Sequence, residues 1–350
     1  MKTLEYIIGL QQKIVPEMSS LAEKRYELLT YIRYHQPIGR RALATQMNLS
    51  ESAVRTDIKV LKDAGLVELS GLGVTATQEG WKAVDQLREY VKILHGFLVT
   101  ERYLEKELGV NMVKIVPGDS TSDGCVFKEL GRAAAEVLAE VLKDKMVVAV
   151  SGGSTMASVA AAVSGYLPDT LIVPTRGGLG ENVERQANSV AAVMARNLGG
   201  QYRLLHIPEG LNDEALEAIK NTDSTVSEIE ELIQKADVMI HSIGRADVMA
   251  HRRTHAPKVA ENICKLGVGE ALGHYFSQDG KCIYTYSTNG FRLNNLVGVG
   301  RTIAVAGGVN KAEAILAVIR AGSNDVLVID EAAAGAIQLI IKAEKSQKTF

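Results

Sequence analysis

The chain has 350 residues, of which 46% are hydrophobic and 23% are charged, and its formal net charge is −2. This composition is typical of a soluble globular protein and excludes a mostly disordered chain, a collagen and a bundle of membrane helices. The length predicts two or three folded units. The three cysteines, Cys125, Cys264 and Cys282, lie far apart and fit neither a disulfide framework nor a zinc site, so we expect a cytoplasmic protein without a metal centre.

Two apolar stretches could be a signal peptide or a membrane-spanning helix, and the sequence argues against both. The opening MKTLEYIIGLQQK places Glu5 among its apolar residues, and we expect no signal peptide there. The longest uncharged run, 146–168, contains a glycine pair, four serines and a threonine, which a membrane-spanning helix would hardly use. The run is better read as a strand, a loop and a helix.

The segment 24–62 carries eight basic and three acidic residues, a net charge of +5 inside an acidic chain. Its apolar residues follow a helical spacing that is interrupted at Pro37. After Leu66 the sequence VELSGLGVTAT is short, β-prone and punctuated by glycine, which predicts a hairpin. Helix, turn, charged helix and hairpin in this order predict a winged helix-turn-helix in residues 1–77.

Within this unit, Val54, Ile58 and Leu61 recur at helical spacing and predict one buried face. Asn48 stands at the turn, where a left-handed backbone is needed, and Ser50 is a good N-cap. The opposite face carries side chains suited to base edges and phosphates, whereas solvated charge is the ordinary explanation of any one of them. The predicted DNA contacts are Arg40, Arg41, Ser50, Ser52, Arg55, Thr56 and Lys59.

Residues 78–108 contain no proline and no cluster of turn residues, and apolar side chains recur from Val84 to Leu98 at spacings of 3, 4, 3 and 4. This predicts a linker helix. Two interpretations stay open: an amphipathic helix that lies on the next domain, and a helix that pairs with a second copy.

Residues 109–350 alternate short β-branched runs with alanine-rich helical stretches. Six or more such strands, separated by segments of helix length, predict a Rossmann-like α/β domain with a mostly parallel sheet covered on both faces. The expected strands include VKIVP, MVVAV, LIVP, RLLHIP, DVMIHSI, TIAVAG and DVLVID.

Three of these strands end in glycine-rich turns that open helices, within 149–158, 173–182 and 304–314. The carboxyl ends of parallel strands share one edge of the sheet, so these turns can converge on one crevice. Helix N-termini in glycine loops offer free N–H groups to phosphate. One such turn alone is ordinary backbone geometry, but three with matched hydroxyl and cationic residues predict an anionic ligand. The contributing residues of these turns are Gly152, Gly153, Ser154, Thr155, Arg176, Gly177, Gly178 and Lys311. A further turn, HSIGRADVMAHRR, is expected to bring Arg245, Arg252 and Arg253 toward the same edge.

An enzyme is the alternative. The acid–base candidates are Glu181, Glu270, His274, Asp330 and Glu331. Their arrangement in the sequence does not identify a reaction. Glu270 and His274 would share a helix face, yet HYFSQDGKCIYTY reads as strand, turn and strand. The remaining histidines lack metal-ligand spacing. We therefore predict no catalytic residues.

The succession GRAAAEVL, AVSGGST, VPTRGGLGE, MAHRR, EALGHYF, IAVAGG and KAEAI resembles the SorC/DeoR group of sugar-responsive bacterial transcriptional regulators, along nearly the whole chain. The group is similar in fold to phosphosugar isomerases and deaminases. The resemblance is strongest to the branch that controls glycolytic genes. It implies a repressor of an operon for glyceraldehyde-3-phosphate dehydrogenase, with fructose 1,6-bisphosphate as effector, and a tetramer on operator DNA.

The resemblance also assigns roles. The loop from Gly152 to Thr155 would hold one phosphate, and further ligand contacts would come from Arg176, Gln186, Arg252, Glu270 and Lys311. Glu270 would accept hydrogen bonds from sugar hydroxyls. Our prediction is an allosteric DNA-binding repressor with a reader in 1–77, a linker or dimerisation helix in 78–108 and an effector domain in 109–350. The alternatives are a phosphosugar isomerase or deaminase with an appended DNA-binding unit, a regulator of a different phosphosugar, and a regulator whose assembly the ligand merely tightens.

Overall fold

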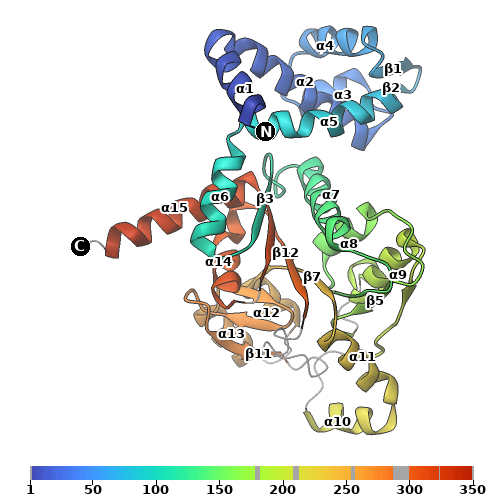
Figure 1. Cartoon of the computed structure of the whole chain (residues 1–350), viewed down its shortest axis with the longest axis vertical. Helices are drawn as coiled ribbons and strands as arrows, with labels where there is room; N and C mark the ends of the chain where they lie inside the picture. The colour runs from blue at the N-terminus through green and yellow to red at the C-terminus, as the bar shows by residue number, and fades with distance from the viewer. Residues whose placement is uncertain are drawn as a thin grey trace. The chain divides into compact units, whose positions relative to one another are not determined.

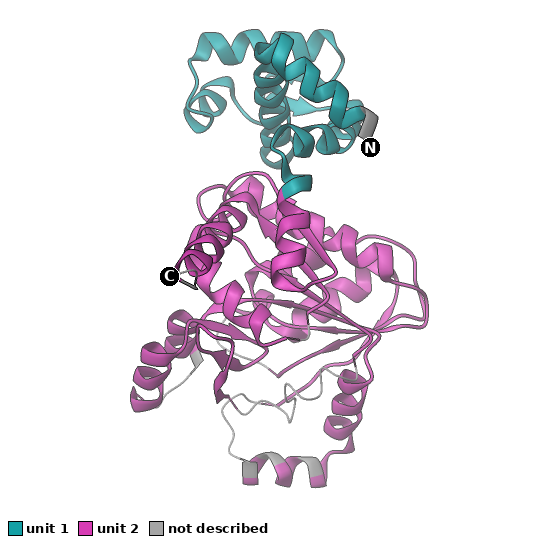
Figure 2. Ribbon diagram, turned by 60° about the vertical axis from the view of Figure 1, so that its left-hand side comes forward, with its two compact units in different colours: residues 1–99 teal, residues 100–350 magenta. Residues whose placement is uncertain are grey.

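The structure is a computed structural model, and it describes residues 2–177, 182–207, 213–253, 257–286, 299–322 and 324–348. The chain divides into two compact units, Met1–Val99 (unit 1) and Thr100–Phe350 (unit 2), which Figure 2 shows in separate colours. Each unit has its own hydrophobic core.

Unit 1 is a winged helix-turn-helix with an additional helix before it. Asn48 has a φ of +51°, and the Ser50 hydroxyl accepts a hydrogen bond from the Ala53 N–H, so the predicted turn and N-cap are both confirmed. The predicted hairpin is an antiparallel pair, and Ile38 bridges to Val74 at its side. In chain order the elements are α1 (Lys2–Ile14), α2 (Pro16–His35), α3 (Arg40–Gln46), α4 (Glu51–Asp63), β1 (Val67–Ser70), β2 (Gly73–Ala76) and α5 (Gln78–Leu94).

The prediction of one helix over 78–108 is wrong. The structure has two helices, α5 and α6 (Phe97–Leu108), separated at Gly96, which has a φ of +68°. A glycine adopts this left-handed conformation without steric cost, and it ends the first helix. Val84 and Val91 of the apolar seam are buried in the core of unit 1, so this part of the seam faces its own domain.

Unit 2 contains a seven-stranded sheet among its described residues, and each of its pairings is parallel. The order is β3-β13-β12-β7-β4-β5-β6, so the chain builds outward in opposite directions from the neighbouring strands β4 and β7. This confirms the mostly parallel α/β domain. The strands are β3 (Met112–Val116), β4 (Val147–Val150), β5 (Leu171–Pro174), β6 (Gln201–Tyr202), β7 (Val238–Ser242), β12 (Arg301–Val305) and β13 (Val326–Asp330).

Side chains of alternate residues along each strand enter two separate cores. Val148 and Val150 pack with the helices α7, α8 and α9, whereas Ala149 lies in the cluster on the opposite face, with α11. Figure 1 shows α7, α8 and α9 along one side of the sheet and α14 and α15 on the other. The helices of unit 2 are α7 (Gly124–Val141), α8 (Ser154–Ala162), α9 (Ala187–Leu198), α10 (Asp213–Thr222), α11 (Ser224–Gln234), α12 (Ala246–Arg253), α13 (Pro257–Leu266), α14 (Ala312–Arg320) and α15 (Glu331–Lys348), with short 3-10 turns at Val183–Arg185 and Val309–Lys311.

The predicted strand RLLHIP is mostly absent from the sheet. β6 ends at Tyr202, and one further backbone bond joins the Arg203 N–H to the Ile172 carbonyl. The side chain of Asn188 then hydrogen-bonds both the N–H and the carbonyl of Leu205, and so replaces the next strand partner. A side chain of α9 therefore ends this edge strand early.

A small antiparallel sheet follows, in the order β11-β10-β9-β8. Its strands are β8 (Gly244–Arg245), β9 (Gly269–Ala271), β10 (His274–Phe276) and β11 (Cys282–Thr285). The strand–turn–strand reading of HYFSQDGKCIYTY is confirmed. Glu270 lies on β9 and His274 on β10, so the two do not share a helix face.

The other edge of the large sheet is bound by α6. The Ile115 N–H donates to Glu101 over 2.8 Å, and the Val113 N–H donates to Glu105 over 3.1 Å. Carboxylates thus satisfy edge N–H groups that would otherwise be open to a further strand. These bonds attach α6 firmly to unit 2.

Candidate functional site

The exposed face of α4 is the first candidate site. Val54, Ile58 and Leu61 are buried on its inner side, as predicted. The predicted DNA contacts are all exposed: Arg40 and Arg41 at the start of α3, Ser50 at the N-cap of α4, and Ser52, Arg55, Thr56 and Lys59 along α4. A helix that presents cationic and hydroxyl side chains on one face matches what base edges and phosphates accept.

Some of these side chains already have local partners. Arg41 pairs with Glu51 at 3.4 Å, and the Thr56 hydroxyl donates to the Ser52 carbonyl over 3.0 Å. Both interactions lie on the exposed surface, where an ion pair contributes little and can be exchanged for phosphate.

Asp57 of α4 is a buried residue that the sequence analysis did not single out. Its side chain is buried and pairs with Lys24 at 2.7 Å and Arg25 at 3.1 Å, both on α2. Burial by itself would raise the pKa of this carboxyl, but hydrogen bonds from Lys24 and Arg25 outweigh it and hold the pKa below its usual value. Its position three residues after Val54, on the buried face, was the available signal.

The second candidate site is a pocket at the carboxyl edge of the large sheet. It lies where the loops after β4 and β7 diverge, which is the usual ligand position in an open α/β sheet. Its empty volume, including its open mouth, is about 560 Å³. The lining residues are Ser151, Gly152, Gly153, Ser154, Thr155, Arg176, Ser242, Ile243, Gly244, Met249, Arg252, Glu270, Leu272 and Lys311.

The glycine pair after β4 lets the backbone form one wall of this pocket. A Cβ on Gly152 would lie 2.7 Å from the Arg185 carbonyl oxygen, and Gly153 has a φ of +115°, so larger residues would be excluded at both positions. α8 begins at Ser154, and its first N–H groups face this turn. A helix N-terminus with two hydroxyls beside it, those of Ser154 and Thr155, has free N–H groups and a positive dipole end of the kind that suits an anion.

Three cations from three other segments line the same pocket: Arg176 after β5, Arg252 on α12 and Lys311 in the 3-10 turn before α14. Arg176 is buried, Arg252 is exposed at the rim, and Lys311 is half-buried. Burial lowers the pKa of the Lys311 ammonium, the charge of Asp330 opposes this, and nearby Arg252 adds to the lowering. An anion in the pocket would stabilise the charged form of Lys311. Glu270, also buried, accepts a hydrogen bond from the Gly273 N–H over 2.8 Å.

The structure brings together most, but not all, of the residues predicted for the ligand. Gly177 does not line the pocket; a Cβ there would lie 1.9 Å from the Ile207 carbonyl oxygen, so packing explains this glycine. Gln186 precedes α9, beside the backbone that contacts Gly152, but is not a lining residue. Gly178 lies outside the described residues.

The sequence predicted that the turn after β7 reaches this edge, but four of the pocket residues that this region supplies were not among the predicted ones. Ser242, Ile243, Gly244 and Met249 all line the pocket. Their signal was the position of HSIG at the end of a buried strand, where a parallel sheet opens its crevice. Arg245, expected at the same edge, instead pairs with Asp247 at 2.6 Å.

Among the acid–base candidates, Glu270 lines the pocket, and Asp330, Glu331 and His274 have structural partners. Asp330 accepts hydrogen bonds from backbone N–H groups, Glu331 accepts from the Gly118 N–H, and His274 contacts the Thr285 hydroxyl. Glu181 falls outside the described residues.

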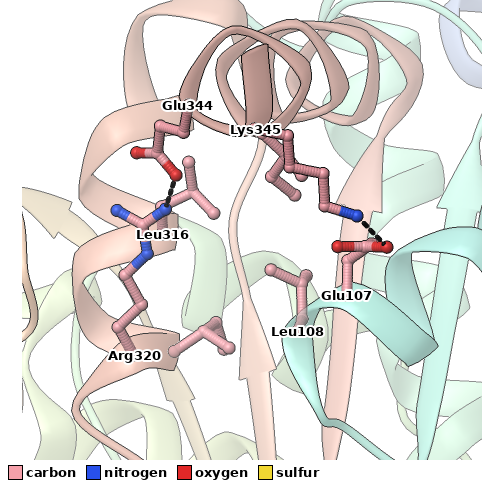
Figure 3. A pocket seen from close by; sticks show the side chains of 8 residues that line it. Glu107, Leu108, Leu316, Arg320, Glu344 and Lys345 are labelled. Atoms are coloured by element: carbon pink, nitrogen blue, oxygen red, sulfur yellow. Dashed lines mark hydrogen bonds and ion pairs between the residues drawn. The ribbon is translucent and has the colours of Figure 1, made fainter. Parts of the chain in front are cut away.

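Unit 2 has a further pocket, which Figure 3 shows between α6, α14 and α15. Glu107 of α6 pairs with Lys345 of α15 at 2.5 Å, and Arg320 of α14 pairs with Glu344 of α15 at 2.5 Å. Apolar side chains, among them Leu108 and Leu316, lie between the two pairs. The ion pairs connect α15 to the neighbouring helix α14 and to α6, which is distant in sequence from both.

Two classes of site were not found in the part of the chain that the structure describes. It holds no group of three or more His, Cys, Asp or Glu side chains that could bind a metal ion. In the same ranges, no helix combines the length and the apolar character needed to cross a membrane.

Two family matches cover nearly the whole chain. Residues 21–91 match the CggR N-terminal DNA binding domain, and residues 94–338 match a sugar-binding domain. The first match contains α4, and the second contains the pocket at the carboxyl edge of the sheet.

Proteins of similar sequence or structure are named as regulators of genes or operons. The central glycolytic genes regulator of Priestia megaterium is 40% identical over 94% of this chain and 97% of its own length, and that of Bacillus subtilis is 38% identical over 95% and 98%. A SorC family transcriptional regulator from Enterococcus faecalis has a TM-score of 0.63 at 36% identity, over 68% of this chain and 99% of that chain. The full-length sorbitol operon regulator SorC from Klebsiella pneumoniae shares the fold, with a TM-score of 0.62 at 14% identity over 97% of this chain and 100% of that chain.

Proposed function

Because the chain belongs to the family of the central glycolytic genes regulators, we propose that it represses a glycolytic operon under the control of a phosphorylated sugar. The reader would lie in residues 1–77, the helices of 78–108 would connect it to the effector domain, and residues 109–350 would bind the effector. The proposed target is an operon that encodes glyceraldehyde-3-phosphate dehydrogenase, and the proposed effector is fructose 1,6-bisphosphate.

The observation that carries the effector proposal is the charge of the pocket. Three cations, Arg176, Arg252 and Lys311, line it from separate segments of the chain, and the N-terminus of α8 adds a further positive end. One carboxylate, Glu270, stands among them. Such an excess of positive charge suits a ligand with more than one anionic group, and the carboxylate suits its hydroxyls. We propose Gly152, Gly153, Ser154 and Thr155 as contacts of one phosphate, and Gln186, Gly177 and Gly178 as residues that shape the adjoining loops.

Thermal unfolding in the presence of candidate ligands tests the effector. At a ligand concentration one hundred times its dissociation constant, fructose 1,6-bisphosphate should stabilise the protein by about 2.7 kcal/mol and raise the midpoint of unfolding. Fructose 6-phosphate and inorganic phosphate, at equal concentration and ionic strength, should shift the midpoint less because each offers a single phosphate.

An equal shift with all three compounds would contradict the bisphosphate proposal and favour a general phosphate site. No shift with any of them would remove the proposed effector while leaving the DNA reader in place. Turnover of a phosphosugar would favour the enzyme alternative; we propose binding without turnover, since the similar proteins are named as transcriptional regulators. We propose that the protein is a homo-oligomer. Measurement of the size of the protein with and without ligand tests whether the ligand tightens this oligomer, which is the alternative to a ligand that releases DNA.

We propose that α14 and α15 carry the effect of the ligand to α6. α14 begins directly after Lys311 and ends at Arg320, which pairs with Glu344 of α15. One residue further along α15, Lys345 pairs with Glu107 of α6, as Figure 3 shows. The chain leads from α6 through Gly96 into unit 1, so a shift of α14 reaches the connection to the reader.

A Glu107→Gln protein is therefore expected to bind both the operator and the effector but to respond less to the effector. Substitutions in coupling elements change the coupling free energy by about 0.5–2 kcal/mol, so the effector-dependent ratio of operator affinities should fall roughly 2- to 30-fold. Fluorescence anisotropy with labelled operator, with and without effector, measures this ratio.

The matched control for this prediction is Lys235→Met, which removes a surface ion pair with Glu231 on α11. It should leave the ratio unchanged. A wild-type ratio in Glu107→Gln would contradict the proposed route through α15 and α6.

A further inference from the structure

Asp330 ends the buried strand β13, and its carboxylate connects three segments of unit 2. Its Oδ2 accepts hydrogen bonds from the Ser120 N–H at 2.8 Å, the Ser120 hydroxyl at 2.5 Å and the Gly308 N–H at 2.7 Å. Its Oδ1 accepts from the Ala333 N–H at 2.9 Å, in the first turn of α15. The side chain is fully buried, so these donors replace the water that a carboxylate requires.

The turn before Lys311 is built directly on this carboxylate. A Cβ on Gly307 would lie 2.6 Å from Asp330 Oδ2 and 2.3 Å from the Ser120 hydroxyl oxygen. Gly308 has a φ of +100°, and a Cβ there would lie 2.2 Å from Thr121. No larger residue fits either position, so Asp330 and the loop of Ser120 determine the path of the turn.

Lys311 follows this turn and lines the pocket. Its N–H donates to the Gly308 carbonyl over 3.0 Å, which ties the start of the short 3-10 turn to the glycine pair. Burial lowers the pKa of Lys311, and the negative charge of Asp330 raises it. Asp330 therefore acts on Lys311 in two ways, through the backbone that holds it and through its charge.

We propose that Asp330 is a positioning residue of the effector site: it fixes the Gly307–Gly308 turn and keeps Lys311 a cation placed to meet a phosphate group of the ligand. The inference rests on the proposed function, since it concerns the same pocket. Asp330 itself does not line the pocket, and it acts on the ligand site through the turn that it holds.

The test is Asp330→Asn, with fructose 1,6-bisphosphate and inorganic phosphate as probes and isothermal titration as the measurement. Asparagine has nearly the same size, but its amide nitrogen cannot accept the hydrogen bonds that one carboxylate oxygen accepts now. We expect affinity for the bisphosphate to fall roughly 10- to 100-fold, because hydrogen bonds to a charged group are lost and the turn loosens. Operator affinity without ligand should stay at the wild-type value.

The pH profile separates this role from a purely structural one. Wild-type affinity for the bisphosphate should fall as the pH rises through the pKa of Lys311, because the cation is lost. Asp330→Asn removes the charge that raises this pKa, so the fall should occur at lower pH. A Lys311→Met protein should lack this fall, and the double variant should bind no more weakly than Lys311→Met.

Asp325→Asn is the matched control. Asp325 precedes the same strand at its other end and accepts hydrogen bonds from the Thr302 N–H and hydroxyl, at 2.8 and 3.0 Å. Its substitution should leave the affinity and the pH profile for the bisphosphate unchanged. An unchanged affinity and profile in Asp330→Asn would overturn the inference, whereas a wild-type protein that binds neither probe would overturn the proposed function instead.

If Asp330→Asn does not fold, Ser120→Ala takes its place, because it removes hydroxyl bonding to Asp330 and keeps the charge. The expected result is a loss of about 2- to 10-fold in affinity for the bisphosphate, with an unchanged pH profile. Wild-type affinity in this variant would overturn the proposal.

Discussion

An Arg55→Ala protein is expected to bind its operator more weakly and the effector with unchanged affinity. Arg55 lies on the exposed face of α4, opposite the buried Val54 and Ile58, and the fold of unit 1 does not depend on its side chain. Loss of an arginine contact to a base edge costs about 1–3 kcal/mol, a fall of roughly 5- to 150-fold in operator affinity. Fluorescence anisotropy at one fixed salt concentration measures it, since affinity for DNA varies steeply with salt.

Lys82→Ala is the control for this prediction. Lys82 is an exposed cation of the same unit, paired with Glu79 on α5, so the substitution makes the same change of charge away from α4. It should weaken operator binding much less. Equal losses in both variants would show that net charge alone acts, and equal loss of operator and effector binding in Arg55→Ala would contradict the assignment of the two domains.

The second large effect is expected in the stability of unit 1. Asp57→Asn leaves Lys24 and Arg25 without their shared carboxylate, and removal of one partner of a buried ion pair costs about 3–5 kcal/mol. Since Lys24 and Arg25 are partly exposed, with side-chain exposures of 32% and 28%, we expect the lower end of that range. Urea unfolding, followed through the transition of unit 1, measures the loss.

Asp63→Asn provides a control at the exposed end of the same helix, and it should change stability little. If the two variants were equally stable, the ion pairs of Asp57 with α2 would not contribute substantially to the free energy of unfolding.

The same carboxylate predicts a dependence on pH. The folded pKa of Asp57 lies below its unfolded value, so its contribution to stability is complete above about pH 4 and is lost as the pH falls through the folded pKa. Asp57→Asn should therefore lose less stability than wild type between neutral pH and about pH 3. Parallel pH profiles for the two proteins would contradict this.

Local features of this chain could be predicted because they depend on neighbours in sequence. The turn at Asn48, the cap at Ser50 and the glycine pair at Gly152 follow from backbone sterics and nearby donors. Short β-branched runs between alanine-rich helical stretches predicted the parallel strands in the same way. The early end of β6 could not be predicted, since it depends on the side chain of Asn188, which lies on the preceding helix α9 and bonds the backbone of Leu205.

Helix α5 shows how a correct pattern leaves the partner of an apolar face undetermined. The apolar spacing from Val84 onward is real, but the sequence does not state which surface covers it. The core of unit 1 takes Val84 and Val91, and Gly96 separates this helix from α6. A stripe of apolar residues indicates that a face is buried and leaves its partner open.

The sequence by itself determined the two folds, the exposed cationic face of α4 and the glycine turns that could receive an anion. Only the tertiary structure decided which groups meet: Asp57 with α2, Asp330 with the turn before Lys311, and Ser242 with the pocket wall. The reason is physical. Periodicity, caps and left-handed turns arise from interactions a few residues apart, whereas the partner of a buried charge is set by the order of strands and the packing of helices, which no local pattern records.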